Sequence, residues 1–341
     1  MNTLSKLLRV LTTMLILAVV TAVASCSGSS DDTTLVGDWY KKSDLEGVGR
    51  SGAVSVVIDG KAYVGTGFDG TKWLTDWWQY DPNQDFWVKQ DPFPGDARTA
   101  AVAFEAGGKA YVGTGYADDV LYDDFYVFDP SIAPGQGQWQ PIAAYPGGKR
   151  YGAVAFSVGG AGYVGTGYNE ENYLKDMWRY VPGNNAWTQV VSVTGSKRAY
   201  AFAFVVDGKG YVGGGQNNNV LQYDLYEFDP EAGELGGWKA KLALNDDTQP
   251  ATNISRQQTV AFTINGLVYL VGGASSSIDN QVWEYNPTLD TWARKTDFEG
   301  AARENAVGFS IGNRGYVTTG RNSSARYDDI WQFDPTAPDV D

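Results

Sequence analysis

The chain has 341 residues, a formal net charge of −14 and no histidine. Such a negative field repels phosphate backbones, so we expect no nucleic-acid partner. The absence of histidine excludes Ser-His-Asp and Cys-His nucleophilic systems and every imidazole metal site.

The first 25 residues have the form of a secretory signal peptide. Lys6 and Arg9 precede an apolar stretch at 10–24, which is too short to span a membrane comfortably and ends in small residues. The segment Val23-Ala24-Ser25-Cys26 resembles the lipobox of bacterial lipoproteins, in which the cysteine becomes the acylated N-terminal residue. An ordinary signal peptide followed by an unrelated cysteine is the alternative.

The lipobox resemblance implies lipidation of Cys26 and attachment to the membrane through the N-terminal lipid alone. Ser27 stands where lipoproteins kept at the inner membrane usually carry Asp, so the resemblance implies an outer-membrane lipoprotein. Residues 26–34 are expected to be a lipidated flexible tether. Its acidic pair, Asp31-Asp32, resembles a surface-export signal of some lipoproteins or simply keeps the tether solvated. Periplasmic and surface-exposed locations both stay open.

The rest of the chain, 35–341, repeats one pattern six times. Each copy has an arginine, an apolar run, a two-residue turn, the segment Tyr-Val-Gly-Thr-Gly or a variant, and an aromatic strand. The leading arginines begin 47 to 58 residues apart, at Arg50, Arg98, Arg150, Arg198, Arg256 and Arg303. A fixed period near fifty residues predicts a propeller or a solenoid.

Each copy reads as four strands. The apolar runs, such as 53–58, are nearly continuous, which is typical of a strand covered on both faces. Turns such as Asp59-Gly60 accept positive φ and predict a tight hairpin to the second strand. The proline of Asp81-Pro82 and its counterparts ends the third strand, and a Trp-bearing fourth strand follows. We therefore predict a single all-β domain, a six-bladed β-propeller.

The two ends of the domain complement each other. The sixth copy stops at Pro335, and residues 336–341 contain no Trp and no apolar run. Trp39 stands 11 residues before Arg50, the separation between Trp87 and Arg98. The segment 36–42 is therefore expected to supply the fourth strand of the last blade and to close the ring.

These features resemble kelch-repeat propellers from about residue 35 to 335. The glycine pair of that family is present as Gly214-Gly215 and Gly272-Gly273. In the other copies the first member is a threonine, at Thr66, Thr114, Thr166 and Thr319. The resemblance specifies the fold but not the function. Some kelch propellers resemble the central domain of galactose oxidase, whose copper is held by His and by a Tyr crosslinked to Cys; without histidine, this chain is not a copper oxidase.

Residues present in every copy are interpreted as structural. We expect the leading arginines to pair with carboxylates or carbonyls where one blade meets the next, and the tryptophans to pack between blades. The recurring aspartates are interpreted as turn or strand-start residues: Asp76, Asp124, Asp176, Asp224 and Asp329.

Residues that break the repeat are the candidates for function. The connections from second to third strand emerge on the same face as those from each fourth strand to the next blade. They carry aromatic rings beside amides and carboxylates, a mixture that suits a carbohydrate or peptide. The candidate ligand-binding residues are Phe68, Trp73, Tyr116, Tyr168, Tyr173, Gln216, Asn217 and Arg321. The alternative is a set of solvated loops whose rings pack on neighbouring blades.

Two acidic features of the sequence are further candidates for a site. Glu304 directly follows Arg303 and, with Arg321, would place an acid and a guanidinium at one mouth of the channel; a surface ion pair is the alternative. The cluster between Asp118 and Asp124 would suit calcium, but it lacks the spacing of a known calcium loop and otherwise forms a solvated acidic edge. We predict no cofactor and no metal site.

Three functions are consistent with the sequence. The first is a monomeric, lipid-anchored envelope protein that binds a glycan or an envelope protein without chemistry. The second follows from a resemblance to the sialic-acid mutarotases, which are also six-bladed kelch propellers of the bacterial envelope. It implies metal-free acid/base catalysis with Glu304 as base and Arg321 orienting a carboxylate. The third is a scaffold within an envelope complex.

Overall fold

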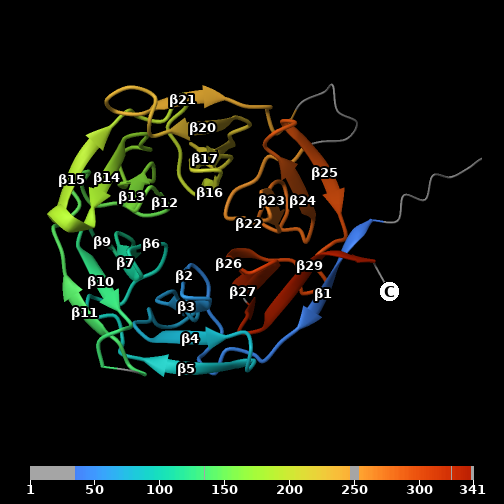
Figure 1. The fold of residues 1–341 in the computed structure, drawn as a ribbon, viewed down its shortest axis with the longest axis horizontal. Coiled ribbons are helices and arrows are strands. Elements are labelled where there is room, and N and C mark those ends of the chain that lie inside the picture. Colours follow the sequence, from blue (N-terminus) through green and yellow to red (C-terminus); the bar gives the residue numbers. More distant parts are fainter. Residues whose placement is uncertain (1–34, 134, 246–252, 324, 339–341) are drawn as a thin grey trace, which may run out of the picture. The chain divides into compact units, whose positions relative to one another are not determined.

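Six antiparallel sheets surround a central axis and form the blades of a propeller (Figure 1). The computed structural model describes residues 35–133, 135–245, 253–323 and 325–338. The predicted signal peptide, Cys26 and the tether lie outside the described residues, so the structure does not bear on them. The prediction of an all-β six-bladed propeller is confirmed.

Each blade has four main strands, which are given below in order from the axis outward (Figure 1). Blade 1 consists of β2 (Val54–Ile58), β3 (Lys61–Gly65), β4 (Trp77–Asp81) and β5 (Phe86–Gln90). Blade 2 consists of β6 (Val102–Ala106), β7 (Lys109–Gly113), β10 (Phe125–Asp129) and β11 (Gln138–Pro141). Blade 3 consists of β12 (Val154–Val158), β13 (Ala161–Gly165), β14 (Met177–Val181) and β15 (Ala186–Val190), with the short 3-10 helix η1 (Pro182–Asn184) before β15.

The second half of the ring follows the same plan. Blade 4 consists of β16 (Phe202–Val206), β17 (Lys209–Gly213), β20 (Leu225–Asp229) and β21 (Gly237–Ala240). Blade 5 consists of β22 (Val260–Ile264), β23 (Leu267–Val271), β24 (Val282–Asn286) and β25 (Thr291–Lys295). Blade 6 consists of β26 (Glu304–Ile311), β27 (Arg314–Asn322), β29 (Ile330–Pro338) and, from the other end of the chain, β1 (Val36–Lys41).

The hairpin between the first two strands of each blade turns on two residues. In blades 1 to 5 both turn residues have positive φ, as Asp59 (49°) and Gly60 (72°) show, which matches the primed turns expected from the sequence. In blade 6 Gly312 alone has positive φ, at 60°. A glycine at the first central position is the requirement of the mirror-image type II turn, so Asn313 needs no strained backbone there.

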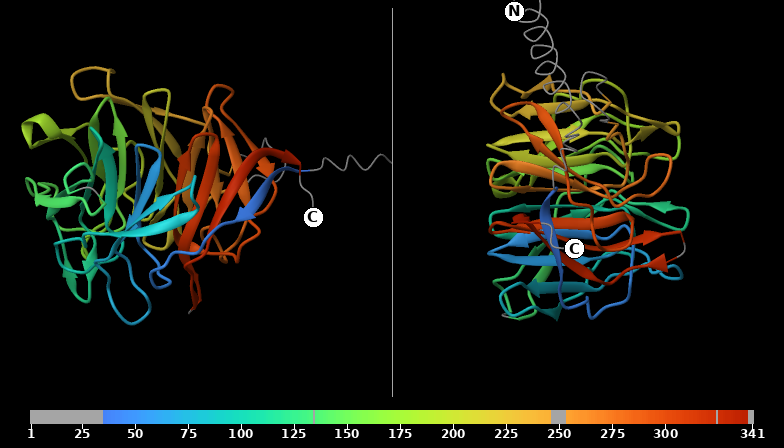
Figure 2. Two further views of the ribbon diagram at one scale, coloured as in Figure 1. Left: turned by 60° about the horizontal axis from the view of Figure 1, so that its bottom comes forward. Right: turned by 90° about the vertical axis from the view of Figure 1, so that its right-hand side faces the viewer.

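Strand β1 closes the ring. It pairs antiparallel with β29, and Trp39 lies opposite Phe333 (Figures 1 and 2). The indole of Trp39 is 3% exposed and packs against Phe298 of blade 5 at 4.8 Å and Phe333 of blade 6 at 4.7 Å between ring centroids. The predicted completion of the last blade by the N-terminal strand is confirmed.

The hydrophobic core is divided into six clusters, and each lies between two consecutive blades. Every cluster contains, or packs against, one fourth-strand tryptophan. The indole N–H groups of Trp87, Trp139, Trp187 and Trp238 each donate to a backbone carbonyl of the preceding blade or of the connection that leaves it. The tryptophans therefore serve the blade-to-blade packing that the sequence predicts.

The six leading arginines are buried, at 0 to 2% exposure, and each is surrounded by acceptors. The guanidinium of Arg50 donates to the carbonyls of Val48 and Thr66 and makes two bonds to the Asp76 carboxylate, at 2.5 and 2.7 Å. Aromatic rings cover several of these groups; Arg303, for example, lies 4.9 Å from the ring of Phe298. Complete satisfaction of the donors is what allows a charge to stay buried.

The interpretation of the recurring aspartates as simple turn residues was incomplete. Asp76 and its four counterparts are the ion-pair partners of the leading arginines, within the same blade. Burial alone would raise the pKa of Asp76, but the hydrogen bonds and charge of Arg50 outweigh it and hold the pKa below its usual value. The arginine side chain thus ties the start of a blade to its own third strand. The contact of the arginine with the neighbouring blade is made by its backbone.

A closed circuit of backbone hydrogen bonds links neighbouring blades. The N–H of the last glycine in each glycine segment donates to the carbonyl of the leading arginine of the next blade, at 2.8 to 2.9 Å. The circuit runs through Gly67, Gly115, Gly167, Gly215, Gly273 and Gly320, and the last of these bonds to Arg50. Each leading arginine therefore fixes two blades, one by its side chain and one by its carbonyl.

The threonines that replace the first glycine of the kelch pair adopt a left-handed backbone. Thr66 has φ of 58° and Thr166 has φ of 60°, a conformation that is strained for a β-branched residue. Their carbonyls accept the arginine Nη1 at 3.2 and 2.9 Å, so the arginine holds this conformation in place. In blade 4 a Cβ at Gly214 would approach the Phe202 ring to 2.8 Å, and glycine is required.

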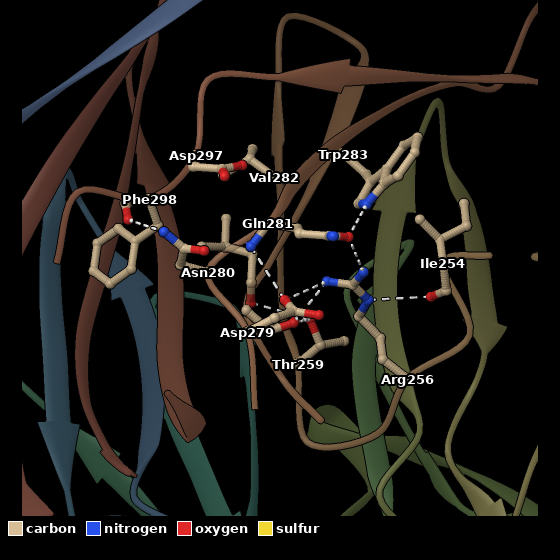
Figure 3. A network of polar contacts seen from close by, with 12 residues as sticks. Ile254, Arg256, Thr259, Asp279, Asn280, Gln281, Val282, Trp283, Asp297 and Phe298 are labelled. Atoms are coloured by element: carbon tan, nitrogen blue, oxygen red, sulfur yellow. Dashed lines mark hydrogen bonds and ion pairs between the residues drawn. The ribbon is translucent and has the colours of Figure 1, made fainter. Parts of the chain in front are cut away.

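Blade 5 departs from the arginine pattern (Figure 3). Gln281 occupies the aspartate position, and its amide oxygen accepts both from Arg256 and from the Trp283 indole. The negative charge comes instead from Asp279, whose carboxylate lies 3.2 Å from the guanidinium. Burial raises the pKa of Asp279 and lowers that of Arg256, and the single long contact offsets this only in part. This is the weakest of the six arginine sites.

We predict that Asp76→Asn lowers the free energy of unfolding by about 3 kcal/mol, because it leaves a buried guanidinium without its counter-charge. Chemical denaturation measures the change. Since the folded-state pKa of Asp76 is lowered, its contribution is present above the unfolded-state pKa of about 3.9 and is lost as the pH falls through the folded-state value. The difference between wild type and variant should therefore shrink in acid.

Asp81→Asn is the matched control for this variant. Asp81 pairs with Lys61, whose side chain is 42% exposed, at 3.4 Å. The Asp81 side chain is 13% exposed, but its lysine partner reaches solvent, so this pair should contribute about 1 kcal/mol. Equal losses for the two variants would show that the buried arginine network does not hold the blade together.

Candidate functional site

One face of the propeller carries a ring of six paired positions, here called the mouth. In every blade the residue after the leading arginine lies opposite the residue after the glycine segment. The pairs are Ser51–Phe68, Thr99–Tyr116, Tyr151–Tyr168, Ala199–Gln216, Gln257–Ala274 and Glu304–Arg321. The sequence analysis named the second member of five of these pairs and, separately, Glu304; the structure joins all six pairs as one ring of unlike side chains.

The next residue inward forms a second closed circuit of backbone hydrogen bonds. Each N–H donates to the equivalent carbonyl of the neighbouring blade at 2.8 to 3.2 Å, and all six residues have φ between 50° and 63°. They are Gly52, Ala100, Gly152, Tyr200, Gln258 and Asn305. Only two are glycines, so the circuit holds four other residues in the left-handed region and fixes their side chains at the rim of the channel.

A small cavity of about 170 Å³ opens at the mouth. Drug-sized sites have volumes of roughly 300–1,000 Å³, so this one suits a small ligand or one terminal group of a larger molecule. Apolar and aromatic surface comes from Phe68, Tyr116 and Tyr200, and amides come from Gln258 and Asn305. Among the described residues, its charged lining groups are two guanidiniums, Arg321 and Arg326.

Glu304 and Arg321 form an ion pair across the first two strands of blade 6. Oε1 of Glu304 accepts from Nε of Arg321 at 2.9 Å and lies 2.7 Å from Nη2. The glutamate side chain is 11% exposed, whereas that of the arginine is 37% exposed. The pair anticipated from the sequence therefore exists, with its cationic member turned toward the ligand side.

Arg326 belongs to the same site but comes from another part of blade 6. It lies on β28 (Ala325–Arg326), which pairs with the end of β27 and so sets Arg326 opposite Arg321. Its guanidinium lies over the Phe68 ring of blade 1, 4.9 Å from the centroid. Phe68 in turn packs on Trp73 at 4.8 Å. Two blades thus present two cations and two rings at one side of the mouth.

Five tyrosines, here called the tyrosine group, extend from the cavity across blades 2 to 4. Tyr151 lies at its centre, with ring centroids 4.5 Å from Tyr116, 5.7 Å from Tyr168 and 6.0 Å from Tyr200. Tyr168 packs on Tyr173 at 4.7 Å. Burial raises the pKa of Tyr151 to about 12 and that of Tyr200 further, so both stay neutral hydrogen-bond donors at physiological pH.

The structure brings most of the predicted ligand residues together. Phe68, Tyr116 and Arg321 line the cavity, and Trp73, Tyr168 and Tyr173 extend from them. Gln216 and Asn217 form the short strand β18 (Gln216–Asn217), which pairs with β19 (Val220–Leu221) and lies outside the cavity lining.

Sequence reasoning overlooked five contributors: Tyr151, Tyr200, Gln258, Asn305 and Arg326. Four of them directly follow a leading arginine by one or two positions. The two positions after each leading arginine vary between copies as strongly as the loops do. This variation is the signal by which the sequence could have indicated these four residues.

The channel below the mouth offers little chemistry. Its wall is built largely from small side chains such as Ala101, Ala155 and Ala203. The hydroxyls of Ser55 and Thr263 donate to backbone carbonyls of the preceding blade, at 3.3 and 2.9 Å. Within the described residues, Glu105 is the single charged group lining this part of the channel. The carboxylate of Glu105 accepts the N–H of Gly108 at 2.8 Å.

The acidic cluster of blade 2 is divided by the fold. Asp124 is bound to Arg98, and Asp118, with φ of 49°, forms the turn between β8 (Tyr116–Ala117) and β9 (Val120–Leu121). In the part of the chain that the structure describes, no three Cys, Asp or Glu residues are grouped closely enough to hold a metal ion. No helix in that part is long and apolar enough to span a membrane.

Comparison with known proteins agrees with this architecture. Residues 255–298, which contain Arg256 and most of blade 5, match the Kelch motif. The solved structure of YjhT superposes with a TM-score of 0.71 over 84% of this chain and 95% of that one. The chain is a six-bladed propeller that carries a Kelch motif at residues 255–298.

The sequence identity to YjhT is 15%, so the likeness concerns the fold alone. No curated protein matches the sequence significantly. The function of this propeller must therefore be argued from its own mouth, and in particular from the residues that differ between its blades.

Proposed function

We propose that this propeller is a binding protein that takes a small anionic ligand, of which a carboxylated sugar is the best match, at its mouth. The carrying observation is that both charged groups lining the cavity are guanidiniums, on a chain whose formal net charge is −14. Guanidinium forks suit the bidentate recognition of carboxylate. Phe68, Tyr116 and Tyr200 offer ring faces to the apolar side of a sugar, and Gln258 and Asn305 offer amides to its hydroxyls.

Glu304 has a defined place in this proposal. Its carboxylate holds Arg321 in the absence of ligand, so the guanidinium is positioned before binding and loses little conformational freedom. A neutral sugar can accept only a hydrogen bond from Arg321 through a hydroxyl, whereas a carboxylate also gains the attraction between charges and competes with Glu304 for the guanidinium. Selectivity for an acidic over a neutral sugar follows from this arrangement.

Arg321→Ala should weaken binding of acidic monosaccharides by at least tenfold and leave any binding of neutral ones unchanged. Calorimetric titration of residues 35–341 with glucuronic, galacturonic and N-acetylneuraminic acids, beside glucose and galactose, measures this. Arg314→Ala is the control, since it breaks an ion pair of the same strand and length: Arg314 contacts Asp334 at 2.7 Å with 30% exposure. The proposal fails if no acidic sugar binds, or if the two variants behave alike.

Lipid attachment at Cys26 is proposed on the sequence alone, since this residue lies outside the described part. We place the propeller at the outer membrane, facing the periplasm or the cell surface, with a glycan or an envelope protein as the source of its ligand. Cys26→Ser should release the protein from membranes and abolish incorporation of labelled palmitate in cells. Membrane retention of that variant would contradict the lipoprotein assignment.

A catalytic alternative is a mutarotase that exchanges the anomers of an acidic sugar without metal. What favours it is the position of the Glu304 carboxylate beside Arg321 at the ligand side. In the free protein Glu304 is ion-paired with that arginine; a substrate carboxylate that engaged Arg321 would release Glu304 to act as the base.

The alternative predicts that wild type accelerates anomer exchange of an acidic sugar, followed by NMR, and that Glu304→Gln reduces the rate by roughly 10²- to 10⁴-fold, the usual contribution of a general base. Arg314→Ala again serves as the control. Absence of acceleration by wild type on every acidic sugar that binds would leave the binding function alone.

A further inference from the structure

The tyrosine group reaches beyond the mouth cavity. Tyr116 and Tyr200 line the cavity, and Tyr151 connects them to Tyr168 and Tyr173 on the blade 3 loop. All five side chains are partly exposed. An aromatic surface therefore continues from the site of the proposed ligand toward solvent, across three blades.

The hydroxyls of this group can be compared with those of the core. Several core tyrosines bond within the chain, as Tyr80 donates to Asp85 at 2.7 Å and Tyr211 to Glu227 at 2.7 Å, whereas Tyr111 has no such partner among the described residues. In the tyrosine group, Tyr168 donates to the carbonyl of Glu170 at 2.5 Å. For the other four, no hydrogen bond from the hydroxyl to a described residue is present. These four partly exposed phenols are therefore available to hydrogen-bond a molecule outside the chain.

The blade 3 loop is built to hold two rings side by side. The side-chain oxygen of Asn169 accepts the N–H groups of Glu171 and Asn172 at 3.2 and 2.7 Å, and Tyr168 and Tyr173 face each other across this turn. Blade 1 repeats the device. There Asp69 accepts from Thr71 and Lys72, both at 2.7 Å, and Phe68 faces Trp73. Turns of this kind preorganise rings at low entropic cost.

The two ring pairs differ in what covers them. Arg326 lies over the Phe68 ring of blade 1. Among the described residues, no cation lies over Tyr168 or Tyr173. The blade 1 pair is thus part of the charged side of the mouth, whereas the blade 3 pair is uncharged and partly exposed, with the Tyr173 hydroxyl available to a ligand.

We infer that Tyr168 and Tyr173, with Tyr151, form a second subsite that stacks the sugar residue next to the one in the cavity, so that the ligand is an oligosaccharide ending in an acidic residue. This inference rests on the proposed function, because it assumes that the cavity holds the acidic end. The cavity volume of about 170 Å³ leaves no room for a second ring, which must then lie along the tyrosine group. Rings cover its apolar face and the unengaged phenols bind its hydroxyls.

The inference predicts a gain in affinity with chain length. Wild type should bind oligosaccharides that end in glucuronic, galacturonic or N-acetylneuraminic acid about tenfold more tightly than the free acids, as expected for one added ring-stacking contact. Tyr168→Ala/Tyr173→Ala should remove that gain and change the affinity for the free acid by less than twofold. Calorimetry with matched pairs of monosaccharide and oligosaccharide measures both.

Two further variants separate stacking by the rings from other effects of removing a tyrosine. Tyr168→Phe/Tyr173→Phe should retain most of the gain, because stacking persists without the hydroxyls. Tyr223→Ala is the matched control, a tyrosine 42% exposed on the corresponding loop of blade 4 and outside the tyrosine group. It should bind both ligand lengths as wild type does.

The outcomes separate the two proposals. Free acids that bind as tightly as the oligosaccharides would overturn the second subsite and leave the proposed function intact. Failure of every acidic sugar, short or long, would overturn both. Neutral oligosaccharides that bind as tightly as acidic ones, or carboxylated peptides that bind more tightly, would overturn the inference that the ligand is an acidic oligosaccharide.

Discussion

Six buried guanidinium groups hold this propeller together. Each belongs to an arginine whose side chain ties the start of one blade to that blade's third strand, and whose carbonyl accepts a bond from the preceding blade. A buried charge is tolerated only when its donors are satisfied, and here a carboxylate and two carbonyls surround it. The strained threonines and the closed backbone circuits depend on the same residue. A defect at one arginine therefore reaches two blades at once.

Because the arginines, aspartates, glycines and tryptophans are committed to this frame, few positions are left for function. They are the two residues after each arginine and the loop after each glycine segment. The frame places the first of these opposite the start of the loop and fixes the second in a left-handed conformation at the rim. Substitutions at these two residues and in this loop can therefore change the mouth while the arginine, aspartate and glycine contacts of the ring are kept.

The mouth is not sixfold in its chemistry. Blade 6, with the adjoining loop of blade 1, supplies guanidiniums and one carboxylate; blades 2 to 4 supply phenols. The proposed ligand matches both sides, with a negative charge at one end and apolar faces with hydroxyls at the other. The absence of histidine, which excludes many catalytic systems, does not weaken such recognition, because guanidinium, amide and phenol groups carry it. Blade 5, whose arginine is held by a longer contact to Asp279, contributes mainly the amide of Gln258.

The sequence by itself determined the number of blades, their four strands and the closure of the ring by residues 36–42, because each depends on a local pattern that is repeated in register. It also marked Glu304, Arg321 and most of the aromatic candidates, since each interrupts that pattern. Only the tertiary structure decided which of these residues meet. The pairing of arginine with aspartate 26 residues later, the opposition of Tyr151 to Tyr168 and the position of Arg326 over Phe68 join segments from different strands or blades. Such contacts depend on where the strand ends of neighbouring blades lie in the closed ring. The spacing of residues within one repeat does not determine those positions.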